Sequence, residues 1–113
     1  MFEEYQKIKA HKTIVEGIIS ERYKADKLKV GEVSALESAI RAIEYYHGET
    51  QDGRILSYIA RNSPHVLLYR DAYTMRALRA GLRALQQKER VLERQCKETN
   101  SQYKDAYHPS MTT

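Results

Sequence analysis

Apolar residues recur every three or four positions along most of the chain, the spacing at which they share one face of an α-helix. The first such segment covers residues 2–27, and a second covers residues 34–47. No run of alternating apolar and polar residues predicts a β-strand, so the pattern predicts an all-α fold. The residues that share a face are Phe2, Tyr5, Ile8, Val15 and Ile18, with Ile14 and Ile19 beside them, in the first segment, and Leu36, Ile40 and Ile43 in the second.

Residues typical of helix ends bound the second segment. Ser34 and Glu37 have the spacing of a capping box, in which the serine oxygen accepts a backbone N–H and the glutamate reaches back to the cap. Gly48 suits the left-handed position that follows a helix. We therefore expect a helix over residues 34–47, preceded by a turn over residues 28–33.

A short third helix is expected after Gly48. Asp52 is placed to cap it over residues 53–61. Ile55 and Ile59 would then face the core, because they lie four positions apart.

Ser63 and Pro64 predict the start of the last helix, because serine is a favoured N-cap and proline fits the first helical position without losing a hydrogen bond. Its apolar pattern continues to about Lys97 and has two faces. We expect one face to pack inside the subunit and the other against another helix or a second chain, which predicts a homo-oligomer. The first face comprises Leu68, Met75, Leu78, Leu82, Leu85, Leu92 and Cys96, and the second comprises Tyr73, Ala77, Ala80, Ala84 and Val91.

The predicted fold is a small arrangement of four helices, in the order long, medium, short and long. A chain of 113 residues is long enough for one domain with one core, which we place at residues 1–98. Residues 99–113 lack apolar periodicity and are expected to form a flexible C-terminal tail.

The last helix also carries a line of positive charge. Basic residues recur along it at steps of three, four and seven, so they fall within an arc of roughly 60° over some 30 Å of helix. All but one are arginine, whose planar guanidinium matches phosphate oxygens. This surface, the basic stripe, comprises Arg76, Arg79, Arg83, Arg90, Arg94 and Lys97.

Charge is distributed unevenly along the chain, whose net charge is +4. Residues 31–60 hold two Lys/Arg against five Asp/Glu, whereas residues 61–98 hold nine against four. A concentrated positive line attracts polyanions. We therefore expect a non-enzymatic protein that binds nucleic acid or another polyanionic surface. His65 and Tyr69 extend the basic stripe upstream, where an aromatic ring would stack on bases.

Two other interpretations of these features remain open. Glu37 and Glu44 are one heptad apart and would pair with the stripe arginines if the two helices faced each other. The basic stripe would also suit an assembly or inhibitor protein that docks on the acidic surface of a protein partner. For the nine tyrosines, the alternative to base stacking is that they fill half-exposed edges of the core.

A third possible function rests on Glu37, Arg41 and His47, spaced Glu-x3-Arg-x5-His. The spacing resembles the arginine–histidine signature of the HEPN family, helical domains that often act as metal-independent ribonucleases in dimers. The resemblance implies that His47 would shuttle a proton while Arg41 holds the scissile phosphate. On a regular helix the two side chains point about 120° apart, so they would converge only if the helix broke near Tyr46.

Other chemistry is not indicated. The histidines form no pair at i, i+4 and have no adjacent set of carboxylates, so we expect no metal site and no cofactor. Cys96 lies on the leucine face, where a thiol acts as a small hydrophobic residue. Because no apolar run approaches the length of a membrane span and no secretory signal is evident, we expect a cytoplasmic protein without a membrane partner.

Overall fold

The computed structural model of the chain describes residues 2–20, 28–62 and 71–107, with side chains as far as residue 99. These residues form four helices, which confirms the predicted all-α fold. None of the described helices is long and apolar enough to cross a membrane. The helices are α1 (Phe2–Ile19), α2 (Val30–His47), α3 (Gln51–Asn62) and α4 (Ala72–Tyr107).

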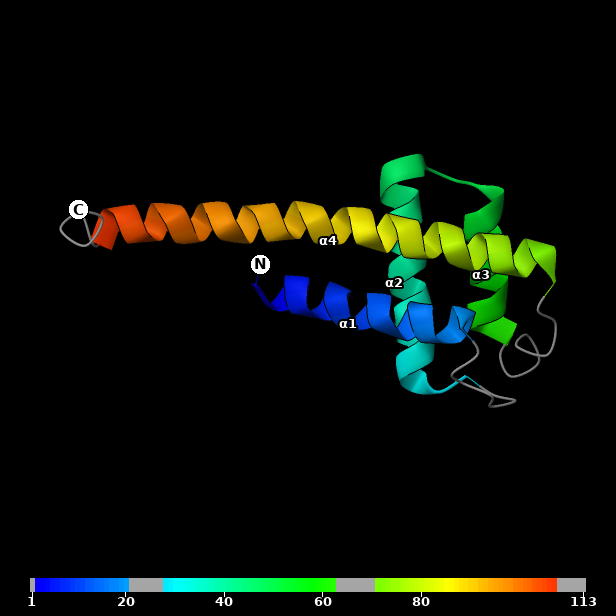
Figure 1. Cartoon of the computed structure of the whole chain (residues 1–113). Coiled ribbons are helices and arrows are strands. Elements are labelled where there is room, and N and C mark those ends of the chain that lie inside the picture. Colours follow the sequence, from blue (N-terminus) through cyan, green and yellow to red (C-terminus); the bar gives the residue numbers. More distant parts are fainter. Residues whose placement is uncertain (1, 21–27, 63–70, 108–113) are drawn as a thin grey trace.

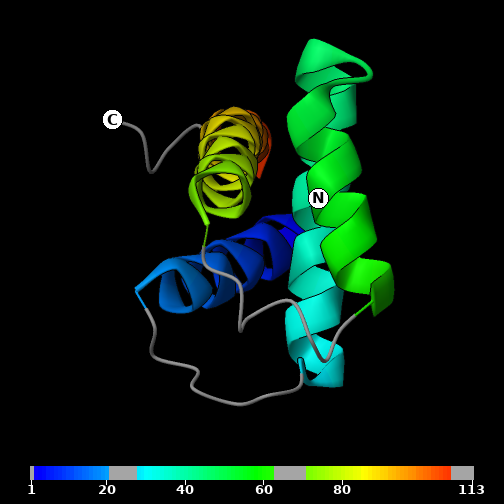
Figure 2. The ribbon, with the colours of Figure 1, turned by 90° about the vertical axis from the view of Figure 1, so that its right-hand side faces the viewer.

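The helices lie in two layers that cross. Helices α1 and α4 lie side by side and antiparallel, and the pair formed by α2 and α3 crosses behind them (Figure 1). The view turned by 90° separates the layers, with α4 seen end-on (Figure 2). Helix α4 packs against each of the other three helices. It extends beyond them at its C-terminal end, so its length of about 54 Å accounts for most of the 59 Å long axis of the molecule.

Both apolar faces of α4 are covered within the chain except at Tyr73, which was assigned to the second face and is exposed. Leu78 and Leu85 are buried on one face, and Ala77 and Ala84 are buried on the other. The sequence left open whether another helix or a second chain covers the second face, and α1, α2 and α3 cover the two faces together. Self-association therefore stays a prediction, but an uncovered apolar face of α4 no longer supports it.

Gly81 lets α4 approach the second layer closely. A Cβ atom at this position would lie 2.9 Å from Leu56 Cδ1, closer than packed carbon atoms allow, and 3.0 Å from Ala39 Cβ, tighter than most packed contacts. Gly81 is buried, at the point where α4 meets α2 and α3. The absence of a side chain therefore sets the distance between the two layers.

The start of α2 corrects the predicted turn over residues 28–33. The helix begins at Val30, because the backbone N–H of Lys29 donates to Glu32 Oε1 at 2.8 Å. Leu28 is buried and Val33 is half-buried, the positions of a hydrophobic staple. Burial of Leu28 favours a helix that begins at Val30 over the predicted start at Ser34. Ser34 and Glu37, predicted to form a capping box, lie inside the helix instead.

The cap of α3 also differs from the prediction. Thr50 Oγ1 accepts the backbone N–H of Gly53 at 3.0 Å, so Thr50 caps the helix and Asp52 lies in its first turn. This register buries Leu56 completely, together with Ile59, and leaves Ile55 half-buried.

The ends of α4 differ from the predicted ones. Asp71 caps the helix through a 2.7 Å hydrogen bond from the backbone N–H of Thr74. This bond lowers the pKa of Asp71, because it favours the ionised carboxylate. The predicted start at Ser63 and Pro64 lies outside the described residues. At the other end the helix continues to Tyr107, past the predicted end at Lys97.

Helix α1 lies within its predicted range but ends earlier than predicted. Ile8, Val15 and Ile18 are in the core, as the periodicity predicted. Phe2, predicted to share that face, is 62% exposed because it lies in the first turn of the helix. The helix ends at Ile19, and residues 21–27 lie outside the described part of the chain.

Candidate functional site

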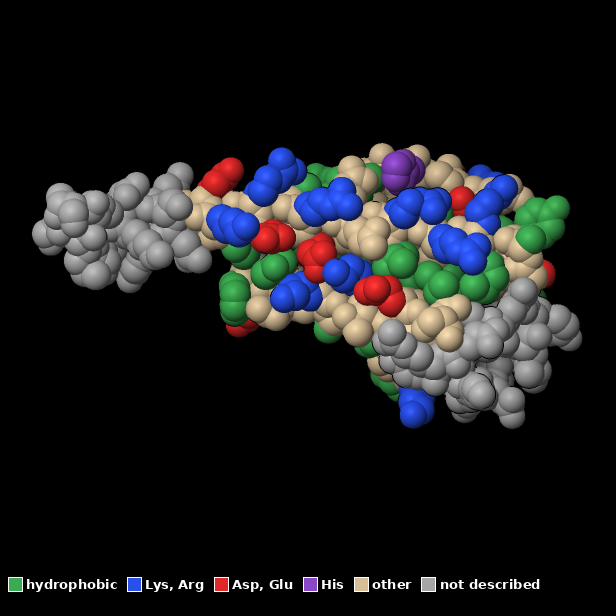
Figure 3. Space-filling model, viewed as in Figure 1, with side chains coloured by type: hydrophobic (Ala, Val, Ile, Leu, Met, Phe, Trp, Pro, Cys, Tyr) green, Lys and Arg blue, Asp and Glu red, His purple; other side chains and the backbone are tan. Residues whose placement is uncertain are grey.

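The basic stripe lies on the outer face of α4. Helix α4 is unbroken from Ala72 to Tyr107, so the predicted arc of about 60° is preserved. Figure 3 shows Lys and Arg side chains in a row along the outer side of α4. Every residue of the stripe is exposed. The charges are therefore accessible to a ligand along the whole row.

Most of the stripe has no acidic partner. Arg76 Nε lies 3.4 Å from Asp52 Oδ1, and Lys97 Nζ lies 3.1 Å from Glu93 Oε1. Both contacts are at the ends of the row. Among the described residues no carboxylate pairs with the four arginines between them. These central arginines are Arg79, Arg83, Arg90 and Arg94.

Other charged residues of α4 are used on a different side of the helix. Glu89 pairs with Lys12 of α1 at 3.0 Å, and Lys88 pairs with Glu4 of α1 at 3.4 Å. The side chain of Glu89 is only 16% exposed, because it lies at the α1–α4 contact. These ion pairs join the two antiparallel helices. They lie away from the stripe, so they do not neutralise its charges.

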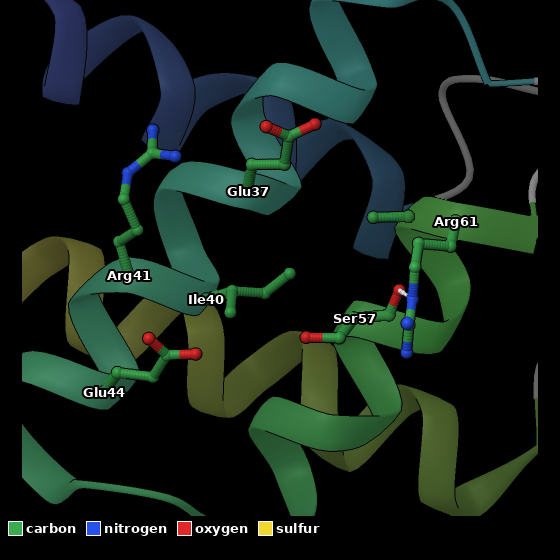
Figure 4. Close-up of a pocket in the computed structure, with 7 residues that line it drawn as sticks. Glu37, Ile40, Arg41, Glu44, Ser57 and Arg61 are labelled. Carbon is green, nitrogen blue, oxygen red and sulfur yellow. Dashed lines mark hydrogen bonds between the residues drawn. The ribbon is translucent and has the colours of Figure 1, made fainter.

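Glu37 and Glu44 do not pair with the stripe. They lie on α2 at a hollow of about 430 Å³ between α2 and α3, together with Arg41 and Arg61 (Figure 4). Both glutamates are exposed. The acid that reaches the stripe is Asp52, from the first turn of α3. The prediction that Glu37 and Glu44 pair with the stripe arginines is therefore wrong. The pairing that the structure shows joins Asp52 to one stripe arginine, Arg76.

The structure separates Arg41 from His47. Helix α2 is continuous through His47 and ends at Gly48, whose φ of 72° is left-handed. Arg41 lines the hollow between α2 and α3, whereas His47 lines a second hollow. The two side chains would converge only if α2 broke near Tyr46, and the helix does not break there. A single chain therefore does not bring the predicted histidine and arginine to one phosphate.

The second hollow flanks the basic stripe. It has a volume of about 230 Å³ and is lined by His47, Thr50 and Asp52 together with Arg83 and Ala80 of α4. Sequence reasoning missed this grouping, because the turn at Gly48 brings the ends of two helices against α4 in a way that only the packing determines. His47 therefore shares this hollow with Arg83 of the stripe and not with Arg41.

Tyr5 is half-buried against the core, as the core-edge interpretation predicted, whereas three other described tyrosines are exposed. Tyr73 is 63% exposed and lies one turn before Arg76. Tyr45 and Tyr58 are also exposed, whereas Tyr46 is half-buried and meets the Tyr45 ring edge-on at 4.9 Å. Burial raises the pKa of Tyr46, and Tyr45 adds to the effect.

Two predicted site residues, His65 and Tyr69, lie outside the described part of the chain. Comparison with known proteins does not extend the site, since no family model, curated protein or solved structure matches the chain.

Proposed function

We propose that this protein binds the phosphate backbone of nucleic acid through the basic stripe of α4, without catalysing a reaction on it. The observation that supports this function is the row of four exposed arginines without an acidic partner among the described residues. They span about 22 Å of one helix face. Nucleic acid offers phosphates in a row, so several contacts form at once.

The energetics favour a multivalent ligand. A single exposed ion pair contributes little, typically below about 1 kcal/mol. Nucleic acid adds the release of condensed counterions, which makes each phosphate contact favourable at low salt. The choice of arginine supports the same ligand, because guanidinium groups bind phosphate through two parallel hydrogen bonds. The proposal implies a cytoplasmic protein that encounters nucleic acid there.

The test removes two central arginines. Arg79→Gln with Arg83→Gln keeps helix propensity, since glutamine is nearly as good a helix former as arginine. We expect the variant to melt like the parent and to bind nucleic acid more weakly. In titrations followed by fluorescence anisotropy, the slope of log affinity against log salt should fall by about 1.8 for duplex DNA, from two lost contacts.

A matched control changes the same net charge away from the stripe. Arg54 and Arg61 are exposed residues of α3, so Arg54→Gln with Arg61→Gln should leave the salt slope unchanged. If the wild-type protein binds neither DNA nor RNA at 50 mM salt, the proposal is wrong. Equal losses in the two double variants would show that net charge alone attracts the ligand.

A second candidate is docking on an acidic protein surface. It is supported by the two carboxylates that the stripe already contacts, Asp52 at Arg76 and Glu93 at Lys97. Affinity capture from nuclease-treated extract tests it. A protein retained by the wild type and lost by the variant Arg79→Gln with Arg83→Gln would favour this function over nucleic-acid binding.

A further inference from the structure

We propose that the basic stripe binds duplex DNA across the major groove, with one arginine pair on each of the two phosphate strands. This inference rests on the proposed function and names its ligand. It follows from the spacing of the four central arginines, which is fixed because they belong to one continuous helix.

The central arginines form two equal pairs. Arg79 and Arg83 are four positions apart, as are Arg90 and Arg94, so each pair spans about 6 Å along the helix. The inner members, Arg83 and Arg90, are seven positions apart, which is about 10.5 Å. The four side chains lie within an arc of about 60°, so both pairs face the same side of the helix.

This spacing matches a groove bordered by two strands. The major groove of B-form DNA is about 12 Å wide and its minor groove about 6 Å. The inner arginines are about 10.5 Å apart along the helix, slightly less than the width of the major groove. Their flexible side chains can spread outward and make up the difference. A helix laid across the groove would then place Arg79 and Arg83 on one strand and Arg90 and Arg94 on the other.

The interval between the pairs carries no charge toward the ligand. Gln87 is exposed there, on the stripe side of the helix, and Gln86 is half-buried. Lys88 points away and pairs with Glu4. A single strand that followed the helix would meet this interval as a gap in its phosphate contacts, whereas a duplex has its groove at this position.

The stripe itself has no aromatic side chains among its basic residues. Proteins that bind single strands stack bases on aromatic rings placed among the basic residues. No aromatic residue occurs between Tyr73 and Tyr103, the interval that contains the whole stripe. Contacts to phosphates alone favour a ligand whose backbone is already ordered, as it is in a duplex.

The test changes the spacing at constant charge. Gln87→Arg combined with Arg90→Gln moves one inner arginine to about 6 Å from Arg83 and breaks the second pair. Both positions are exposed, so the fold should be unaffected, which circular dichroism will verify. We expect affinity for a duplex of 20 base pairs to fall about tenfold, as for the loss of one charge-assisted contact. Affinity for the same sequence as a single strand should not fall.

The outcomes separate the two proposals. Wild-type protein that binds no nucleic acid contradicts the proposed function itself. Wild-type protein that binds single strands as tightly as the duplex, or a duplex affinity unchanged by Gln87→Arg with Arg90→Gln, overturns the groove-spanning arrangement alone. Binding to an RNA duplex at least as tight as to DNA also overturns it, because the A-form major groove is deep and narrow.

Discussion

Adding one methyl group at Gly81 should destabilise the protein, although alanine is the better helix former. The new Cβ would lie 2.9 Å from Leu56 Cδ1 and 3.0 Å from Ala39 Cβ. Leu56 is completely buried, and Ala39 Cβ moves only with the backbone of α2. The layers therefore have to separate to accommodate Gly81→Ala.

The magnitude follows from two opposing contributions. Overpacking a filled core costs typically 1–3 kcal/mol. Replacing glycine by alanine inside a helix contributes roughly 1 kcal/mol in the other direction. We expect Gly81→Ala to lower the free energy of unfolding by about 1 kcal/mol, the difference between these contributions. That is a fall of roughly 4–8 °C in the melting temperature of a domain near this size.

Gly31→Ala is the matched control. Gly31 is exposed near the start of α2, and an added Cβ there would meet no atom within 4 Å. This change should stabilise the protein by up to about 1 kcal/mol. Urea denaturation followed by helical circular dichroism measures both variants. If Gly81→Ala stabilises the protein as much as Gly31→Ala does, then α4 does not approach α2 and α3 as closely as described, and the reasoning is refuted.

Three further predictions concern the electrostatics and assembly of the protein. Burial, followed by the nearby charges of Lys7 and Arg41, lowers the pKa of His11 below its usual 6.5; stability should therefore be constant above about pH 6.5 and fall as pH drops through the folded-state value. Urea midpoints between pH 8 and pH 5 should show this slope in the wild type and a flatter profile in His11→Gln. Asp52→Asn frees Arg76 from its acidic partner, so DNA affinity should rise and the salt slope should steepen by about 0.9; an unchanged slope in the anisotropy titration would show that Arg76 makes no phosphate contact. Light scattering at micromolar concentration and physiological salt should give at least twice the 13.2 kDa chain mass if the protein self-associates, and a monomer would contradict the predicted homo-oligomer.

The helical fold and much of its core were predictable, because burial of one helix face leaves a period in the sequence. Leu36, Ile43 and Leu85 were assigned to the core from that period alone and are buried. The basic stripe was predictable for the same reason, since the positions of side chains on one unbroken helix follow from their numbers. Local geometry was sufficient for these features.

Features that depend on packing were not predictable. Lysine is not a favoured N-cap residue, so Lys29 gave no indication that α2 begins after it, and the burial of Leu28 decided the register. The pairing of Asp52 with Arg76 joins residues 24 positions apart, so it depends on how α3 packs against α4. The two apolar faces of α4 were visible in the sequence, but a sequence does not show whether the covering helices belong to the same chain.

Because α4 packs against all three other helices over only part of its length, its backbone amides should exchange with solvent in two different ways. As far as Leu92, buried side chains tie the helix to the rest of the protein, so exchange there requires the whole domain to unfold. From Arg94 to Thr99 most residues are exposed, and their amides exchange through fraying of the helix end. The boundary falls between Arg90 and Arg94, within one arginine pair. A ligand held by that pair would slow exchange in the following turns, so amide protection would report occupancy of this end of the stripe directly.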